Sequence, residues 1–298
     1  MAETYLTIAR QGRNAWWCYP LSLGLALGLT VNTMLCLGLP FIIMMAIRGD
    51  VLPDEEIWMQ EPIHFFGLMI AVNSLMVFGL TLAIANFHRR SWRTVINPQD
   101  RIRWPRIFQG WIVWLGVILI NIGLLAAFDR DRYTVQFTTG WLWRWGPTLL
   151  VMPVAALMPS MVYGYYLQGL GLLIPQPLRL TAVVAVLIGL GQVVSYPTSP
   201  TLWDWGFAYV TAGFSVWIIL QDQGLELFIG MQAANWLTRL QIVRLPDATP
   251  TFPTLLTRHV GDHTGLTFII WLVGLALFYA VCFYGLPNST PKPRSTNL

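Results

Sequence analysis

Long apolar runs alternate with short polar segments along the whole chain. Residues 14–47 carry no charge, and apolar stretches of similar character recur up to residue 285. About 20 apolar residues in a helix cross the ~30 Å hydrocarbon core of a bilayer at a rise of about 1.5 Å per residue. The pattern predicts eight helices, over residues 14–47, 63–87, 107–128, 147–174, 180–196, 205–221, 225–240 and 265–285. The short run 225–240 is expected to lie partly re-entrant.

Two of these runs contain residues that affect helix shape or packing. Pro153 and Pro159 fall inside the run 147–174. Proline removes a helical hydrogen bond and clashes with the preceding turn, so a kinked or broken helix is expected there. Gly24 and Gly28 have the spacing that lets membrane helices pack closely.

Composition identifies the class of protein. The chain is 55% hydrophobic and only 11% charged, whereas soluble domains average about 25% charged residues. This excludes a soluble or disordered chain, and the net charge of +4 does not indicate a nucleic-acid partner because the basic residues lie between the apolar runs. We expect an all-α, polytopic integral membrane domain over residues 1–298, with a flexible polar tail at 286–298. Cys18, Cys36 and Cys282 show no disulfide or CxxC spacing.

The charges of the connecting segments predict the orientation. Residues 88–106 form the most basic segment, and basic segments stay in the cytoplasm. Residues 50–61 are acidic and are expected outside, whereas Arg10, Arg13, Lys292 and Arg294 place both termini inside. Eight spans satisfy these constraints. The lipid bilayer is therefore the first partner, in the bacterial cytoplasmic membrane or an internal photosynthetic membrane.

Few ionisable residues are available for chemistry within the apolar runs. No histidine occurs between Arg89 and Arg258, and Glu226 is the first glutamate after Glu61. Glu226 is interpreted either as a carboxylate at a helix start, which the helix dipole favours, or as a buried functional group. His259 and His263 are four residues apart, a spacing that binds zinc on a helix, but Gly261 between them favours loop histidines.

Five stretches together resemble one family of membrane proteins. They are Gln11-Gly-Arg-Asn-Ala-Trp-Trp17, Phe87-His-Arg-Arg-Ser-Trp-Arg-Thr-Val-Ile-Asn97, Arg101-Ile-Arg-Trp-Pro-Arg106, Gly164-Tyr-Tyr-Leu-Gln168 and Leu225-Glu-Leu-Phe-Ile-Gly-Met-Gln-Ala-Ala-Asn235. In order and spacing they resemble the CPBP family (CAAX proteases and bacteriocin-processing proteins), which are eight-helix intramembrane metalloproteases. The resemblance covers about residues 8–285 and implies a CPBP-like core at about 140–240.

The resemblance also implies where a catalytic site would lie. The family's Glu-Glu-x-x-x-Arg motif falls on Met158, Pro159 and Tyr163, and its Phe-x-x-x-His motif falls on Ile188 and Gln192. Its His-x-x-x-Asn motif falls on Gln232 and Trp236, next to Asn235. Every acid, base and metal ligand of the motifs is thus replaced by a neutral residue. Catalytic zinc needs about three protein ligands and a polarised water.

The resulting interpretation is a CAAX protease-like pseudoenzyme, with no catalytic residue, metal or cofactor expected. As a membrane scaffold or binding protein it would hold the transmembrane helix of a partner protein or a lipid-like ligand. The candidate cavity-lining residues are Gln192, Gln232, Asn235, Glu226 and Tyr163. One alternative is an active metalloendopeptidase with zinc on Glu226, His259 and His263. The other is a small-molecule transporter with a polar path past Gln192 and Gln232.

Overall fold

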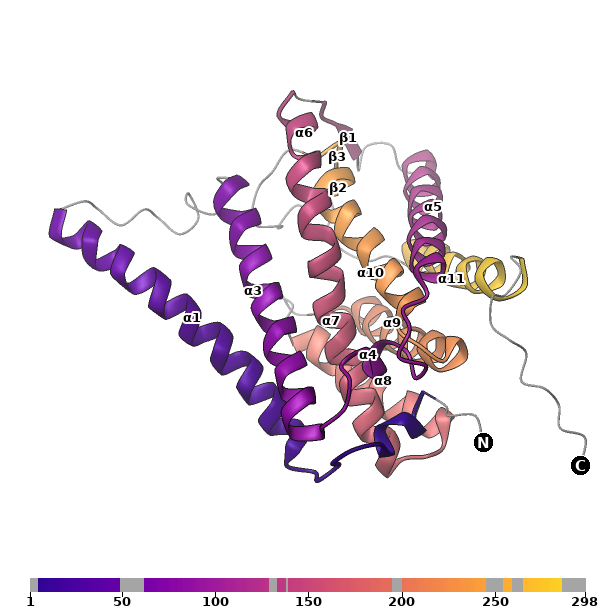
Figure 1. The fold of residues 1–298 in the computed structure, drawn as a ribbon. Coiled ribbons are helices and arrows are strands. Elements are labelled where there is room, and N and C mark those ends of the chain that lie inside the picture. Colours follow the sequence, from indigo (N-terminus) through magenta and orange to yellow (C-terminus); the bar gives the residue numbers. More distant parts are fainter. Residues whose placement is uncertain are drawn as a thin grey trace, which may run out of the picture.

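Helices occupy all eight predicted segments of this computed structural model (Figure 1). The structure describes residues 5–48, 62–128, 133–137, 139–194, 200–244, 254–258 and 265–285. The principal helices are α1 (Cys18–Arg48), α3 (Pro62–Ala83), α5 (Trp104–Phe128), α7 (Trp145–Leu173), α8 (Pro177–Val194), α9 (Leu202–Asp222), α10 (Glu226–Leu237) and α11 (Gly265–Ala280). Short elements are η1 (Thr7–Arg10), α4 (Arg93–Ile96) and α6 (Thr139–Trp143), and π-helical turns η2 (Ile84–His88), η4 (Thr238–Ile242) and η5 (Val281–Gly285) extend α3, α10 and α11.

The bundle has two distinct ends. At the first, which we call the basic end, the N-terminal segment meets the end of α3 through a hydrogen bond from Arg13 N to His88 O. The start of α5 meets the end of α11 there through Arg106 and the carbonyl of Cys282. At the other end, Gly265 at the start of α11 adjoins Trp203 at the start of α9. Successive principal helices therefore run in alternating directions.

A small sheet closes the second end, which we call the sheet end. Strand β1 (Tyr133–Val135) pairs antiparallel with β3 (Leu256–Arg258), and β2 (Val243–Arg244) pairs parallel with β3. No strand was predicted from the sequence, because segments of two or three residues are too short to show an alternating pattern. The sheet links the chain after α5 to the chain after α10.

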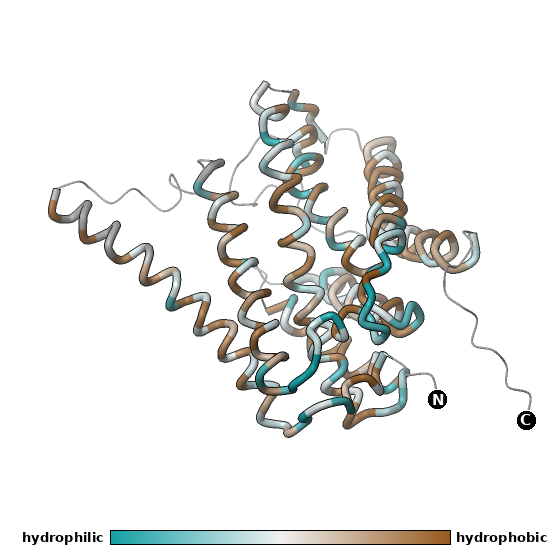
Figure 2. The backbone as a smooth tube through the Cα atoms, viewed as in Figure 1, coloured by the Kyte–Doolittle hydropathy of each residue, from teal (hydrophilic) through white to brown (hydrophobic). Residues whose placement is uncertain are grey.

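The outer surface of the bundle is apolar. Six described helices are long and apolar enough to cross a membrane: Cys18–Cys36, His64–His88, Trp104–Phe128, Trp145–Leu173, Pro177–Val194 and Gly265–Gly285. At most 33% of the most apolar window in any of them is buried inside the protein, so most of this surface needs a lipid environment. Figure 2 shows hydrophobic residues along the outer helices. The prediction of a nearly all-helical membrane protein is confirmed at this level.

Helix α10 lies in the interior of the bundle. It packs against α5, α7 and α9, and nine of its twelve residues are buried. At 12 residues it covers about 18 Å, less than a bilayer core. It belongs to the segment for which a partly re-entrant course was expected, and the structure makes it the central packing element.

The prolines of α7 do not break their helix, and Gly24 and Gly28 of α1 have open surroundings among the described atoms. Helix α7 is continuous through Pro153 and Pro159 instead of broken, because packing against α3 and α10 on its two sides outweighs the hydrogen bonds lost at the prolines. A methyl group placed on Gly24 or Gly28 would meet nothing within 4 Å among the described atoms, so these glycines mediate no close helix contact there.

Glycines bring α5 and α10 into close contact instead. A methyl group on Gly110 of α5 would overlap the carbonyl of Leu227, and one on Gly230 of α10 would overlap the carbonyl of Ile107. The two backbones therefore touch where the helices cross, as small residues allow in membrane bundles. A methyl group on Gly116, also on α5, would meet nothing within 4 Å in the described part of the chain.

We predict that Gly110→Ala and Gly230→Ala each destabilise the protein by about 1–3 kcal/mol, because the added methyl group forces the two backbones apart. Gly116→Ala is the matched control and should leave stability unchanged or slightly raised, since alanine is the better helix former. Thermal unfolding of the purified variants in mild detergent measures both effects. Equal stability of Gly110→Ala and Gly116→Ala would show that the helices do not touch at Gly110.

Candidate functional site

The predicted motif positions on α7 are packed into the protein core. Met158 and Tyr163 pack against the main hydrophobic cluster, and Pro159 is half-buried in the same helix. The ring of Tyr163 lies 5.2 Å, centroid to centroid, from that of Phe228 on α10. Helices α7 and α10, which carry the first and third motif positions, pack against each other. None of these three side chains offers a carboxylate.

The motif positions on α10 form a neutral amide network. Asn235 donates from Nδ2 to Gln232 Oε1 at 2.9 Å, and Trp114 of α5 donates from Nε1 to Asn235 Oδ1 at 2.8 Å. Trp236 packs against a second, smaller hydrophobic cluster that includes Phe65 and Val151. The amides therefore join α10 to α5 through polar contacts that carry no charge.

The motif positions on α8 lie elsewhere. Helix α8 packs mainly against α9. Ile188 packs at the margin of the main cluster, whereas the side chain of Gln192 is exposed. Of the five candidate cavity-lining residues, Tyr163, Gln232 and Asn235 lie half-buried on α7 and α10, and Glu226 is fully buried at the start of α10.

Glu226 belongs to a four-charge cluster at the basic end, formed by Arg103, Arg106, Asp222 and Glu226. Arg103 Nη2 lies 2.8 Å from Glu226 Oε2 and 2.9 Å from Asp222 Oδ2, and Arg106 Nε lies 2.7 Å from Asp222 Oδ1. Asn97 donates from Nδ2 to Glu226 Oε1 at 2.6 Å. Both carboxylates are completely buried as side chains. Every charge of the cluster therefore has a charged partner.

The local chain geometry places these carboxylates side by side. Helix α9 ends at Asp222, and Gln223 adopts a left-handed conformation with φ 53° that turns the chain. Leu225 N then bonds to Ile96 O at 2.8 Å, and α10 starts at Glu226. Two arginines three residues apart at the start of α5 face this turn. Burial lowers the pKa of Arg103, but the two carboxylates outweigh it and hold that pKa above its usual value.

Sequence reasoning did not find the roles of the two arginines. Arg103 and Arg106 were interpreted only as residues that orient the helices. One signal could have revealed the pairing. Two acids lie four residues apart at 222 and 226, and two arginines lie three residues apart at the start of a helix, so the two pairs have similar spacings. For Glu226, the helix-start interpretation holds, with a buried structural role added.

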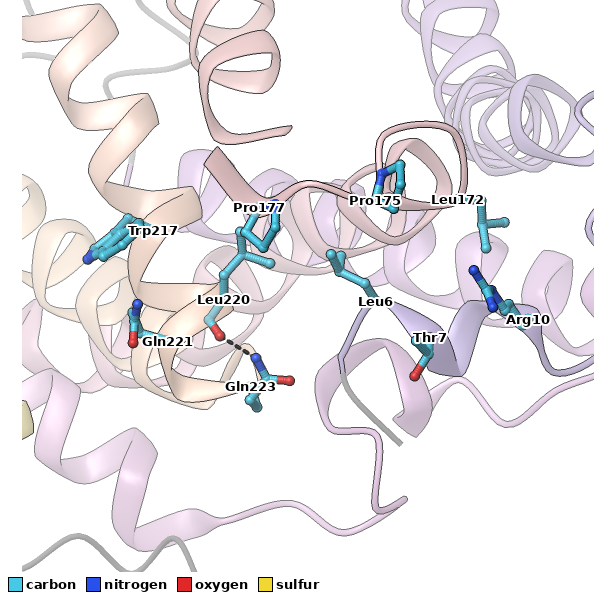
Figure 3. Close-up of a pocket in the computed structure, with 11 residues that line it drawn as sticks. Leu6, Thr7, Arg10, Leu172, Pro175, Pro177, Trp217, Leu220, Gln221 and Gln223 are labelled. Carbon is cyan, nitrogen blue, oxygen red and sulfur yellow. Dashed lines mark hydrogen bonds between the residues drawn. The ribbon is translucent and has the colours of Figure 1, made fainter. Parts of the chain in front are cut away.

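A pocket of about 380 Å³ opens at the basic end (Figure 3). Figure 3 shows η1 on one side of it and the end of α9 on the other, with the turn between α7 and α8 between them. Its lining combines apolar side chains with the charged side chain of Arg10 and the amides of Gln221 and Gln223. The other lining residues are Leu6, Thr7, Gly171, Leu172, Pro175, Pro177, Trp217 and Leu220. Such a pocket suits an amphiphile better than a polar solute.

The histidines of the alternative zinc site, His259 and His263, lie outside the described residues. The described residue before them, Arg258, lies in strand β3 of the sheet, and the described residue after them, Gly265, starts α11 next to Trp203. Glu226 is at the basic end, about 24 Å away along α10 and η4. Within the described ranges, no three His, Cys, Asp or Glu residues gather in a group suited to a metal ion.

The charge cluster predicts a ranking of stabilities. Asp222→Asn should cost about 3–5 kcal/mol, because Asp222 pairs with both arginines and its loss leaves Arg106 buried without a carboxylate. Glu226→Gln should cost about 1–3 kcal/mol, because Arg103 keeps Asp222 and Asn97 keeps an acceptor. Asp100→Asn, at an exposed position, is the control and should change stability by about 0.5 kcal/mol or less. Thermal unfolding in detergent gives the order, and a larger loss for Glu226→Gln than for Asp222→Asn would contradict it.

Comparison with known proteins gives one relative and no family assignment. The chain is 25% identical over 233 residues to the uncharacterized protein YyaK of Bacillus subtilis (strain 168), covering 76% of this chain and 77% of that protein. No protein-family model matches the chain. No solved structure matches it.

Proposed function

We propose that this protein is a non-catalytic membrane protein with a CPBP-like arrangement, a pseudoprotease that acts as a scaffold or binding protein for a lipid-like ligand or a partner's transmembrane helix. The observation that carries the proposal is the ion pairing of Glu226. This residue starts α10, six residues before Gln232 of the third motif, and its two oxygens already hold Arg103 and Asn97. A carboxylate engaged in this way stabilises the fold and is not free to activate water.

The neutral motif positions support the same conclusion. Met158 and Pro159 stand where the resemblance implies two metal-binding carboxylates, and both are packed in a continuous helix. Gln232 is hydrogen-bonded to Asn235, and an amide is a weak ligand that does not act as a base near neutral pH. The retained helix arrangement thus surrounds a centre of neutral polar contacts, which fits a scaffold better than a hydrolase.

The proposal includes an eight-span topology with both termini in the cytoplasm. The alternating course of the principal helices supports it, because the start of α1 and the end of α11 both lie at the basic end. Arg10, Arg13, Arg89, Arg93 and Arg101 also lie in this part of the chain, as cytoplasmic segments require. Under this orientation the pocket of Figure 3 opens at the cytoplasmic face of the membrane.

The pocket favours the lipid-like ligand over the partner helix. Its volume of about 380 Å³ suits a single small amphiphile and is too small for a helix about 10 Å in diameter. Trp217 and the leucines provide apolar contacts, and Arg10 provides one positive charge at the water-facing side. Interfacial pockets of this composition hold lipids through burial of a chain together with head-group electrostatics.

The absence of catalysis is tested directly on the purified protein. We predict no stoichiometric zinc by elemental analysis and no cleavage of a fluorogenic membrane peptide after zinc is added, because the carboxylate and imidazole ligands are missing at the motif positions. The control is Glu226→Gln, checked by gel filtration for correct folding, which should behave as the wild type in this assay. One zinc per chain, with cleavage that Glu226→Gln abolishes, would contradict the proposal.

Binding is tested by lipid analysis after gentle extraction. We predict that the protein retains a lipid-like molecule and that Gln221→Trp loses most of it, because the indole fills the pocket from an exposed position of α9. Gln99→Trp, also exposed at the basic end but outside this lining, is the matched control and should retain the lipid. Mass spectrometry of the extracts measures retention. Co-purification of a membrane protein without any retained lipid would favour the partner helix instead.

A further inference from the structure

Arg90 differs from the other buried arginines at the basic end. Arg89 adopts a left-handed conformation with φ 52°, which ends η2 and turns the chain so that Arg90 points inward. Arg90 is only 8% exposed, and none of its three guanidinium nitrogens has a hydrogen-bond partner. Arg103 and Arg106, at the same end, are both paired with carboxylates. A buried charge without a counter-charge is costly.

The groups around Arg90 do not neutralise it. Burial lowers the pKa of Arg90. The titratable groups that raise this pKa are the hydroxyls of Tyr19, Tyr5 and Tyr165, and no carboxylate is among them. His88 donates from Nδ1 to the carbonyl of Arg13, and its Nε2 lies 2.6 Å from the Tyr165 hydroxyl. Imidazole carries no negative charge in either its neutral or its protonated state, so the site around Arg90 has a net positive charge.

An apolar pocket with two unsatisfied polar atoms adjoins this site. It has a volume of about 250 Å³ and lies between the N-terminal segment and the last turns of α7, lined by Asn14, Trp16, Tyr19, Tyr166, Gly169, Leu170, Leu172 and Leu173. The hydroxyl of Tyr19 and Oδ1 of Asn14 are buried without hydrogen-bond partners. Tyr19 both lines this pocket and interacts with Arg90. Leu172 also lines the pocket of Figure 3, so the two pockets are neighbours.

We propose that Arg90 binds the anionic head group of an amphiphile, a phosphate or a carboxylate, whose chain lies in the pocket along α7. This inference rests on the proposed lipid-binding function and adds that the head group of the ligand is anionic. The guanidinium supplies several N–H donors, Tyr19 a hydroxyl donor, and Asn14 an acceptor for a head-group hydroxyl or a protonated oxygen. Trp16, Leu170 and Leu173 supply the apolar contacts for the chain.

Tyr19 lines the pocket and interacts with Arg90, so the head group approaches Arg90 past the ring of Tyr19. The N-terminal segment is held at this point by two hydrogen bonds between Arg13 and His88, one in each direction. Gly12 precedes them with φ 82°, and a methyl group there would overlap the carbonyl of His88. The segment thus fits closely beside the site.

The test compares amphiphiles that share one oleoyl chain and differ in head group. Native mass spectrometry of the full-length protein in neutral detergent counts bound molecules during titration with oleoyl lysophosphatidic acid, oleic acid and zwitterionic oleoyl lysophosphatidylcholine. We expect one anionic amphiphile per chain, bound at least about tenfold more tightly than the zwitterion, since a charge-assisted contact in a buried site contributes that much. Comparison of the phosphate and the carboxylate probes identifies the preferred head group.

Variants separate a specific site from general surface charge. Arg90→Met should fold and be as stable as the wild type or more stable, because it removes an unpaired buried charge, but it should lose the preference for anionic probes. Arg93→Met, exposed in the same segment, is the matched control and should keep that preference. Tyr19→Phe should weaken binding of the anionic probes severalfold.

Three results would overturn the inference. One is an equal affinity of the wild type for anionic and zwitterionic probes, and another is an unchanged preference in Arg90→Met. The third is binding of inorganic phosphate alone that is as tight as binding of the anionic amphiphiles and that Arg90→Met abolishes. That result would make the ligand a free anion instead of an amphiphile. None of these results depends on the zinc and peptide-cleavage assays, so failure of this inference and failure of the non-catalytic proposal are distinguishable.

Discussion

The four-charge cluster at the basic end is the interaction on which the rest of the structure depends. It joins the start of α5, the turn between α9 and α10, and the end of α11 through Arg103, Arg106, Asp222 and the carbonyl of Cys282. Buried ion pairs repay their desolvation only when the geometry is good and the remaining atoms are hydrogen-bonded. Here Asn97, Gln109 and the backbone supply those additional bonds. The cluster sets where α10 begins, and α10 is the helix that α5, α7 and α9 surround.

The same cluster engages both oxygens of Glu226, on which the proposal of a non-catalytic protein rests. Glu226 is held by Arg103 and Asn97 on the side where α10 meets the loop before α5. Further along α10, the amides of Gln232 and Asn235 continue the polar contacts without charge, and glycines let the backbones of α5 and α10 touch. Along this part of α10 the interior is thus filled by packing and neutral hydrogen bonds, and the paired charges of the four-charge cluster lie at the basic end.

One group of buried polar atoms without partners lies near the N-terminal segment. Arg90, Tyr19 and Asn14 have buried atoms without partners, and two pockets flank the end of α7 there. Arg103 and Arg106 are paired with carboxylates and have a structural role, whereas Arg90 has no counter-charge and is the arginine to which the proposed binding role is given. All three lie at the basic end, which the proposed topology places in the cytoplasm, where anionic lipid head groups are abundant.

The sequence by itself determined the apolar, membrane-protein character of the chain and the positions of the eight helices. Helix length and apolar composition follow directly from residue order, because each run must satisfy its own backbone hydrogen bonds in lipid. It did not predict the continuity of α7 through Pro153 and Pro159, the small sheet, or the contact between Gly110 and α10. The pairing of Arg103 and Arg106 with Asp222 and Glu226 joins residues more than 100 positions apart, and so does not appear in any local pattern. Only the tertiary structure decided these features, because they depend on which helix faces meet and on which charges are buried together when they do.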